Sequence, residues 1–75
     1  MNPDLPLTYF PGSSSVASAG YEADSATLYV NFAKGACYRY LNVPEIVFQS
    51  LITAESAGKF FAANIQKSFP YERCG

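Results

Sequence analysis

Glu22 and Asp24 are the residues of this sequence whose type and spacing could support acid-base chemistry. Two carboxyl groups this close could act as a general acid and a general base, or could hold a hard cation, if a pocket raised the pKa of one of them. The polar stretch 22–25 predicts a turn, however, in which both carboxylates are solvated. The pair therefore does not by itself indicate an active site.

The absence of histidine excludes the commonest catalytic arrangements. A chain without histidine has no Ser-His or Cys-His nucleophile, and with only two cysteines it cannot provide the four Cys or His ligands of a structural zinc site. The sequence also has no cofactor motif. We therefore expect a protein that is not an enzyme and that holds no metal and no cofactor.

Four aromatic and basic residues are candidates for binding. Tyr38 and Tyr40 could stack nucleobases, as sheet aromatics do in RNA-binding modules, at about 1 to 3 kcal/mol for each stacked base, or they could pack in the core with only their hydroxyls reaching outward. Tyr29 beside Arg39 could stack a base or anchor a protein partner. A cross-strand cation-π pair worth about 0.5 to 1 kcal/mol explains the same two residues without a ligand.

Ser56, Gly58 and Lys59 stand at the start of a predicted helix, where free N–H groups and the helix dipole could hold a phosphate. Ordinary capping by Ser56 and close packing at Gly58 explain the same residues. Lys67 is a further basic candidate, although the cations are dispersed in the way of solvated surface charges. Five Lys and Arg against six Asp and Glu give a formal charge of -1, which is not the basic excess usual for phosphate-driven binding.

Short strands must position these residues. Residues 16–21 predict a strand that Gly20 weakens, and the polar turn at 22–25 follows it. Residues 27–32 then alternate apolar and more polar side chains, the period of a half-buried strand. A third strand follows Gly35, which closes a hairpin.

The length of the loop at Gly35 decides the register of this hairpin. A three-residue loop with Gly35 left-handed turns both tyrosines toward the apolar side of the sheet. A two-residue turn would instead bury Arg39 without a partner, and we reject it on that cost. The predicted pairs are Val30 with Tyr38, Leu28 with Tyr40, and Tyr29 with Arg39, of which only the last faces outward.

Two helices follow the predicted sheet. Pro44 suits the first turn of a helix that runs to about Ile52, and Ser56 suits the N-cap of a second helix that runs to about Ser68. Their apolar residues fall on one face each, which should cover one side of the sheet. The fold class is therefore α+β, a three-stranded antiparallel β-meander with two C-terminal helices packed on one face and with the other face open.

The ends of the chain have a different composition from its middle. Residues 1–14 contain three prolines and a glycine and predict a flexible N-terminal tail. As an alternative, the apolar residues of this tail could dock on the domain or supply a strand to a sheet edge. The domain itself should cover residues 15–71, and residues 72–75 should form a C-terminal tail.

Cys37 and Cys74 are expected to be free thiols, because they form no CxxC motif and the sequence has no secretory context. The first 30 residues lack the features of a secretory signal, and no apolar run approaches the roughly 18 residues of a membrane span. These features favour a cytoplasmic protein that does not associate with a membrane.

Several motifs, taken together in their order and spacing, span about residues 15–71. They are Gly20-Tyr21, Leu28-x-Val30-x-Phe32, Gly35, Tyr38-Arg39-Tyr40, Val43-Pro44, Leu51, Ala54-x-Ser56-x-Gly58, Phe60-Phe61 and Ile65. This pattern resembles the KTSC domain, which occurs at the C-terminus of some lysyl-tRNA synthetases and as small stand-alone bacterial proteins. The sequence departs from the family at Ala62, where Asn is frequent, and at Gln66, where a basic residue is common.

The resemblance implies RNA as a ligand, because the family is attached to a tRNA synthetase. We therefore expect a small binding module for RNA, with tRNA as one form. The alternative is a protein interaction or self-association module that uses the open sheet face, in agreement with the net charge of -1. The partner would then be another protein or a second copy of the chain.

Overall fold

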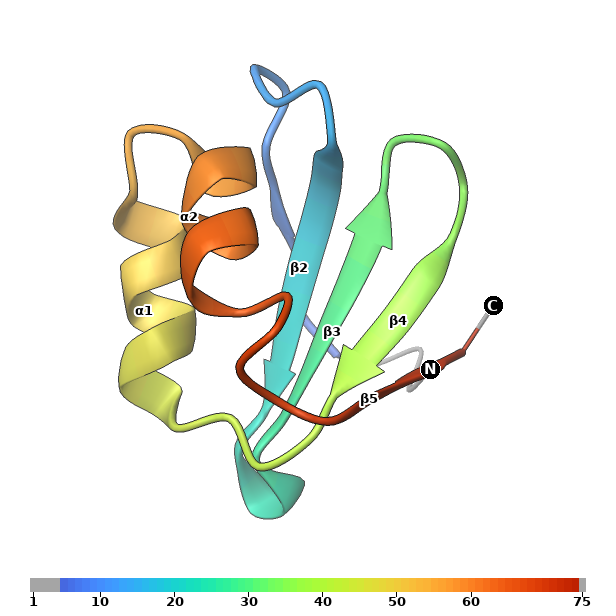
Figure 1. Cartoon of the computed structure of the whole chain (residues 1–75), viewed down its shortest axis with the longest axis vertical. Helices are drawn as coiled ribbons and strands as arrows, with labels where there is room; N and C mark the ends of the chain where they lie inside the picture. The colour runs from blue at the N-terminus through green and yellow to red at the C-terminus, as the bar shows by residue number, and fades with distance from the viewer. Residues whose placement is uncertain (1–4, 75) are drawn as a thin grey trace.

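The computed structural model describes residues 5–74 and contains one five-stranded antiparallel sheet with two helices (Figure 1). The strands lie side by side in the order of the sequence. They are β1 (Thr8–Tyr9), β2 (Val16–Glu22), β3 (Thr27–Phe32), β4 (Cys37–Tyr40) and β5 (Tyr71–Arg73). The predicted three-strand meander corresponds to β2, β3 and β4. The prediction was wrong about the edges, where β1 and β5 each add a short strand.

The β3–β4 hairpin has the predicted register. Gly35 has a φ of 101°, and its N–H donates to the carbonyl of Phe32 at 2.9 Å, as the three-residue loop requires. The observed pairs are Leu28 with Tyr40, Tyr29 with Arg39, and Val30 with Tyr38. A glycine at this position matters because a residue with a Cβ rarely adopts a positive φ.

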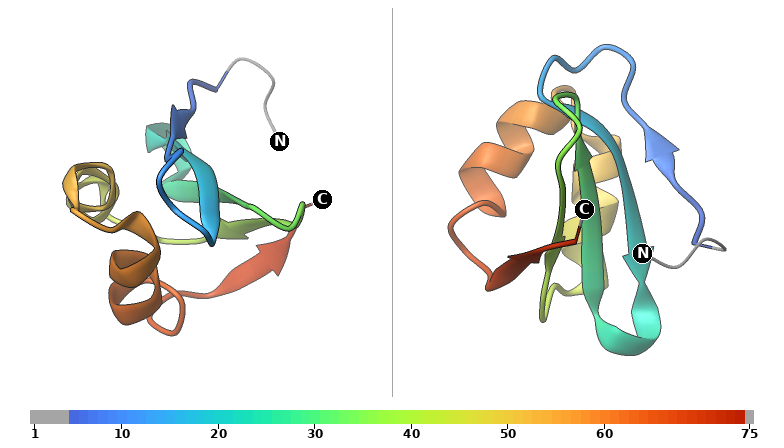
Figure 2. Two further views of the ribbon diagram at one scale, coloured as in Figure 1. Left: turned by 90° about the horizontal axis from the view of Figure 1, so that it is seen from above. Right: turned by 90° about the vertical axis from the view of Figure 1, so that its right-hand side faces the viewer.

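Helices α1 (Glu45–Thr53) and α2 (Ala57–Asn64) follow β4 and cover one face of the sheet (Figure 2). The predicted second helix was too long. Its last turn ends at Asn64, because the N–H of Gln66 donates to the carbonyl of Phe61 at 3.0 Å and Ser68 closes a separate turn onto Ile65. Between the helices and the sheet lies the core, formed by Val16, Ala19, Leu28, Val30, Tyr40, Val43, Leu51, Ala57, Phe61 and Ile65.

The segment from residue 5 to residue 14 docks on the domain. β1 pairs with β2, with Thr8 opposite Ala19 and Tyr9 opposite Ser18, so the alternative of an added edge strand is the arrangement that the structure has. Before β1, Leu5 and Leu7 lie against Gly20, where each Cδ2 would be 2.9 Å from a Cβ at that glycine. Residues 1–4 of the expected tail lie outside the described residues.

The outer face of the sheet, on the side away from the helices, is largely covered, so the expectation of an open face was wrong. Tyr29 on this face is only 8% exposed, and Ser18 and Thr27 are also buried. Gly20 is the ladder partner of Tyr29, so the leucines that rest on Gly20 cover the sheet beside this ring. Figure 2 shows the N-terminal segment on the side of the sheet opposite the helices.

The C-terminal residues form β5 and are joined to β4 by a disulfide between Cys37 and Cys74, whose Cα atoms are 5.3 Å apart. The expectation of free thiols was therefore wrong. It failed because strand pairing brings Cys74 next to Cys37, where its N–H donates to the Cys37 carbonyl at 2.8 Å. No helix among residues 5–74 is long and apolar enough to span a bilayer.

Candidate functional site: a cleft lined by tyrosines

A cleft of about 280 Å³ opens on the helix side of the sheet, and its lining includes Gln66, just after the end of α2. We call it the tyrosine cleft. It is lined by Phe32, Tyr38, Tyr40, Gln66 and Tyr71. Four of its five residues are aromatic and none is acidic. Its volume lies near the lower end of ligand pockets, roughly 300 Å³, so it suits a single planar ring rather than a large ligand.

Tyr40 forms the floor of the tyrosine cleft. It is 3% exposed, and its ring meets Phe61 of α2 edge-on with centroids 5.4 Å apart. Burial, followed by the neighbouring Tyr71 and Tyr38, raises the pKa of Tyr40 to about 12. At neutral pH the Tyr40 hydroxyl therefore stays protonated and serves as a hydrogen-bonding group rather than as a base.

Tyr71 forms the rim. Its ring is 5.5 Å from Tyr40 and 5.6 Å from Tyr38, at tilts of 37° and 43°, while the residue as a whole is 56% exposed. A side chain this exposed keeps much of its ring available for stacking. The cleft therefore has a fixed aromatic floor and an accessible aromatic rim.

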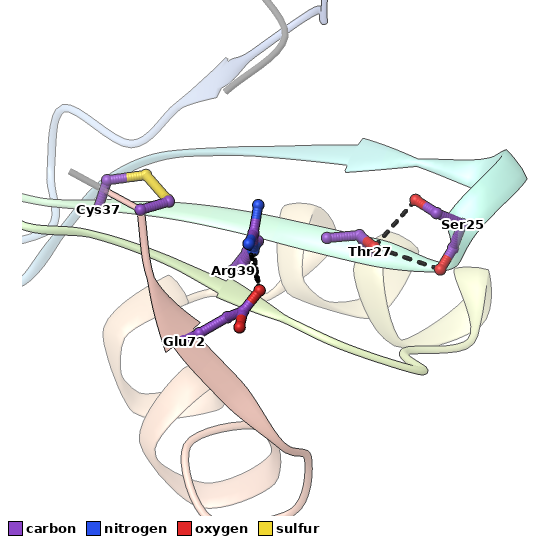
Figure 3. A network of polar contacts seen from close by, with 6 residues as sticks. Ser25, Thr27, Cys37, Arg39 and Glu72 are labelled. Atoms are coloured by element: carbon purple, nitrogen blue, oxygen red, sulfur yellow. Dashed lines mark hydrogen bonds and ion pairs between the residues drawn. A yellow bond between two sulfur atoms is a disulfide. The ribbon is translucent and has the colours of Figure 1, made fainter.

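The charges beside the tyrosine cleft are positive. Arg73 is the ladder partner of Tyr38, and directly opposed residues of an antiparallel pair share a face, so Arg73 lies on the cleft side of the sheet. Lys67 follows the lining residue Gln66 in the chain. Glu72 alternates with Tyr71 and Arg73 and lies on the outer face, where it pairs with Arg39 (Figure 3).

Tyr29 and Arg39, predicted as one binding pair, do oppose each other across the ladder but do not form an accessible site. Tyr29 is only 8% exposed and lies opposite Gly20, on which the N-terminal segment rests. The Arg39 guanidinium is engaged by the Glu72 carboxylate through an ion pair and a hydrogen bond from its Nε. Both residues lie on the face of the sheet away from the tyrosine cleft.

Ser56 and Lys59 are placed at the start of α2, as predicted, and remote from the tyrosines. The Ser56 hydroxyl accepts the Lys59 N–H at 3.3 Å, which is ordinary N-capping. A Cβ at Gly58 would meet the Ser15 Oγ, so Gly58 allows close approach of the serine loop to α2, although the Ser15 side chain could rotate away. Lys67, in contrast, follows Gln66, which lines the tyrosine cleft.

Glu22 and Asp24 do not form an acid-base pair. The Glu22 carboxylate accepts a hydrogen bond of 2.7 Å from the Ser25 hydroxyl at the 3-10 turn Ala23–Ser25, and both acids are in an exposed hairpin end. Among residues 5–74 no cluster of three His, Cys, Asp or Glu side chains could hold a metal ion.

Two other hollows lie beside the N-terminal segment. The larger, about 390 Å³, runs between residues 9–13 and residues 54–57, and Glu55 in its lining would repel a phosphate. The smaller, about 300 Å³, joins the serine loop 12–15 to the start of α2. The larger is lined by two aromatic residues and the smaller by none, whereas the tyrosine cleft has four, so the tyrosine cleft is the better candidate for stacking a ring.

Of the residues predicted from the sequence, Tyr38 and Tyr40 line this cleft, whereas the lining residues Gln66 and Tyr71 were not predicted as binding residues. The sequence Tyr-Glu-Arg-Cys at residues 71–74 does not alternate apolar and polar side chains, so it gave no signal for a strand. The missing step was the pairing of this segment with β4, which brings Tyr71 opposite Tyr40.

Comparisons with known proteins agree with this architecture. The model of the KTSC domain matches residues 12–69. A protein of Stutzerimonas stutzeri (strain A1501) is 47% identical over 49 residues, which are 65% of this chain and 69% of the relative. A protein of Tsukamurella paurometabola is 39% identical over 57 residues, 76% of this chain and 85% of the relative. The names of these two bacterial relatives state no activity or partner.

Among solved structures, the crystal structure of a KTSC domain protein from Yersinia pestis superimposes with a TM-score of 0.86 at 33% identity and covers 95% of this chain and 99% of the other. The fold thus defines a small α+β domain with one antiparallel sheet covered by two helices. The chain belongs to the KTSC domain family, as its sequence motifs indicated.

Proposed function

We propose that this chain is a small non-enzymatic module that binds single-stranded RNA by taking one unstacked base into the tyrosine cleft. The observation that carries the proposal is the position of Tyr71, more than half exposed beside two further tyrosines. RNA-binding proteins recognise bases that are splayed out of a helix and stack them on aromatic side chains.

The polar groups of the cleft support a base rather than an aliphatic ligand. The Gln66 amide offers both donors and an acceptor, and the tyrosine hydroxyls offer both as well. These groups suit the hydrogen-bonding edge of a base whose ring lies on Tyr71. Because Tyr40 stays protonated, the cleft has hydrogen-bonding groups but no general base, which supports binding rather than catalysis.

Electrostatics support only weak phosphate contact. Lys67 and Arg73 are the cations beside the cleft, and the chain carries a net charge of -1. One phosphate contact to a single strand, from Lys67, would give a slope of log K against log salt of about -0.7. Stacking would therefore supply most of the affinity, and salt would weaken it only moderately.

The alternative, protein interaction or self-association through the sheet face, has less support. It rested on an open outer face, and that face carries buried residues and the docked N-terminal segment. A protein partner would need another surface.

An amide NMR titration of the labelled chain with single-stranded RNA oligonucleotides tests the proposal. We expect shifts at Tyr38, Tyr40, Gln66 and Tyr71 that weaken moderately as salt rises, and smaller shifts with DNA of the same sequence if the 2′-hydroxyl is contacted. Absence of shifts at these residues would refute base binding. Shifts that depend on protein concentration alone, without RNA, would instead favour self-association.

A further inference from the structure

The disulfide Cys37–Cys74 lies at the edge of the sheet that carries the rim of the tyrosine cleft (Figure 3). Cys37 begins β4, and Cys74 immediately follows β5. In the chain, only Glu72 and Arg73 separate the rim tyrosine Tyr71 from Cys74. A covalent bond at Cys74 therefore restrains the strand that positions Tyr71.

Apart from the disulfide, β5 is held by its ladder with β4, by the contacts of the Tyr71 ring with Tyr38 and Tyr40, and by side-chain contacts of Glu72 and Arg73. All three of its residues are exposed, and among residues 5–74 the strand pairs only on its β4 side, as an edge strand. The Arg39–Glu72 ion pair joins side chains that are 41% and 50% exposed, and ion pairs of that kind contribute little. Short edge strands with exposed hydrogen bonds are among the segments that open first.

We propose that the Cys37–Cys74 disulfide is a redox gate for the tyrosine cleft. In the oxidised protein β5 is fixed to β4 and Tyr71 lies at the rim. In the reduced protein residues 70–74 detach from β4, while the rest of the sheet stays folded. The release of β5 is independent of the ligand. The consequence for binding rests on the proposed function, because only then does the loss of Tyr71 remove a stacking surface.

The reductant is a dithiol, such as dithiothreitol or a protein with a reactive cysteine pair. Cys37 is 8% exposed and Cys74 is half-buried, so the attacking thiolate reaches the Cys74 Sγ more readily. That attack forms a mixed disulfide with Cys74 and expels the Cys37 thiolate, which takes up a proton. The second thiol of the reductant then displaces Cys74, so the dithiol loses two electrons and two protons to the cystine and becomes a disulfide.

Amide hydrogen exchange of the full chain tests the gate in the oxidised form and after reduction with dithiothreitol. We expect the amides of Tyr71 to Cys74 and of Leu41 to exchange at least about tenfold faster after reduction, since Cys74 and Leu41 donate to carbonyls across this edge. Amides of β2 and β3 should keep their protection. The matched control is the double variant Cys37→Ala, Cys74→Ala, which should behave as the reduced protein with or without dithiothreitol.

Two outcomes would overturn the gate. One is unchanged protection of the β5 amides when both thiols are shown to be free. The other is loss of protection throughout the sheet, which would mean that the disulfide stabilises the whole domain. Binding of single-stranded RNA is then measured for both redox forms. We expect the reduced protein to bind the RNA at least about fivefold more weakly than the oxidised protein. If β5 is released but neither redox form binds RNA, the proposed function is wrong and the redox-dependent release of β5 still holds. If both forms bind RNA equally, the disulfide does not control binding.

Discussion

Tyr71 of β5 lies beside Tyr40 of β4 with ring centroids 5.5 Å apart, and the two residues are direct ladder partners. One ring is buried and the other is more than half exposed. The two residues therefore have different roles: Tyr40 is part of the core, and Tyr71 is accessible to solvent. Substitutions at the two positions should have different effects.

Tyr71→Ala should weaken the binding of single-stranded RNA by about 5- to 150-fold, which corresponds to about 1 to 3 kcal/mol for a stacked base. The fold should persist, because Tyr71 is on an edge strand and is not part of the buried core. Fluorescence anisotropy with a labelled oligonucleotide would measure the change. Tyr71→Phe should retain the binding, since it keeps the ring.

Tyr9→Ala is the matched control for that substitution. Tyr9 is also an exposed edge-strand tyrosine, at 69% against 56% for Tyr71, and it does not line the tyrosine cleft. Its loss should leave RNA binding unchanged. If Tyr9→Ala and Tyr71→Ala weaken binding alike, the cleft is not the binding site.

Phe61→Ala should destabilise the domain by about 3 to 5 kcal/mol, the usual cost of removing a buried phenylalanine ring. Phe61 is buried and meets Phe32 and Tyr40 edge-on, with centroids 5.3 Å and 5.4 Å away. A loss of this size is comparable to the whole stability of many small domains, so the variant should be largely unfolded at room temperature. Urea unfolding followed by circular dichroism would measure it.

Phe60→Ala offers a comparison on the same helix, because Phe60 is only partly buried against the core. It should cost clearly less than the change at Phe61. Equal midpoints for the native protein and Phe61→Ala would contradict the position of this ring in the core.

The central part of the fold could be predicted from local signals. Gly35 limits the hairpin to two loop lengths, and the cost of burying Arg39 then selects the register that the structure has. Pro44 and Ser56 mark the starts of the two helices because their effects on the first turn are local. Each of these inferences needed only residues that are neighbours in the chain.

The edges of the sheet could not be predicted in the same way. β1 and β5 contain two and three residues, too few for a periodic pattern, and both form because a longer strand already offers unpaired groups. The disulfide and the tyrosine rim follow from the pairing of β5, so the sequence indicated only the half of the cleft that β4 supplies. The covered outer face likewise depends on where Leu5 and Leu7 dock.

Gly20→Ala should displace the N-terminal segment from the outer face. A Cβ at this position would meet the Cδ2 atoms of Leu5 and Leu7 at 2.9 Å and the Pro6 carbonyl at 3.0 Å, which is closer than packed atoms approach. Overpacking of this kind costs about 1 to 3 kcal/mol. Limited proteolysis should cut the segment before β1 faster, and Tyr29 should become more accessible to solvent.

Gly12→Ala is the control for this change, because a Cβ at Gly12 meets no atom within 4 Å. It should leave both the cleavage rate and the stability unchanged. Equal cleavage of the native protein and Gly20→Ala would mean that Leu5 and Leu7 do not rest on the sheet.

The pKa of Tyr40 makes the stability of the domain depend on alkaline pH. Burial, with smaller contributions from Tyr71 and Tyr38, raises this pKa from 10.0 to about 12. Above pH 10 the unfolded chain loses the Tyr40 proton while the folded chain keeps it, so the unfolded state binds fewer protons and stability falls as the pH rises. The contribution is complete below pH 10 and is lost as the pH approaches 12.

A difference of this size corresponds to about 2 to 3 kcal/mol. Urea unfolding at several pH values on both sides of 10 would measure the decline. The tyrosinate absorbance band would report which rings ionise. Tyr40→Phe should remove most of the decline, because phenylalanine has no proton to lose. A smaller part should remain in that variant, since burial and the Glu45 carboxylate also raise the pKa of Tyr21. If the stability of Tyr40→Phe declines with pH as much as that of the native protein, Tyr40 is not the buried floor of the cleft. The arrangement in which Tyr71 lies beside a buried Tyr40 would then be wrong.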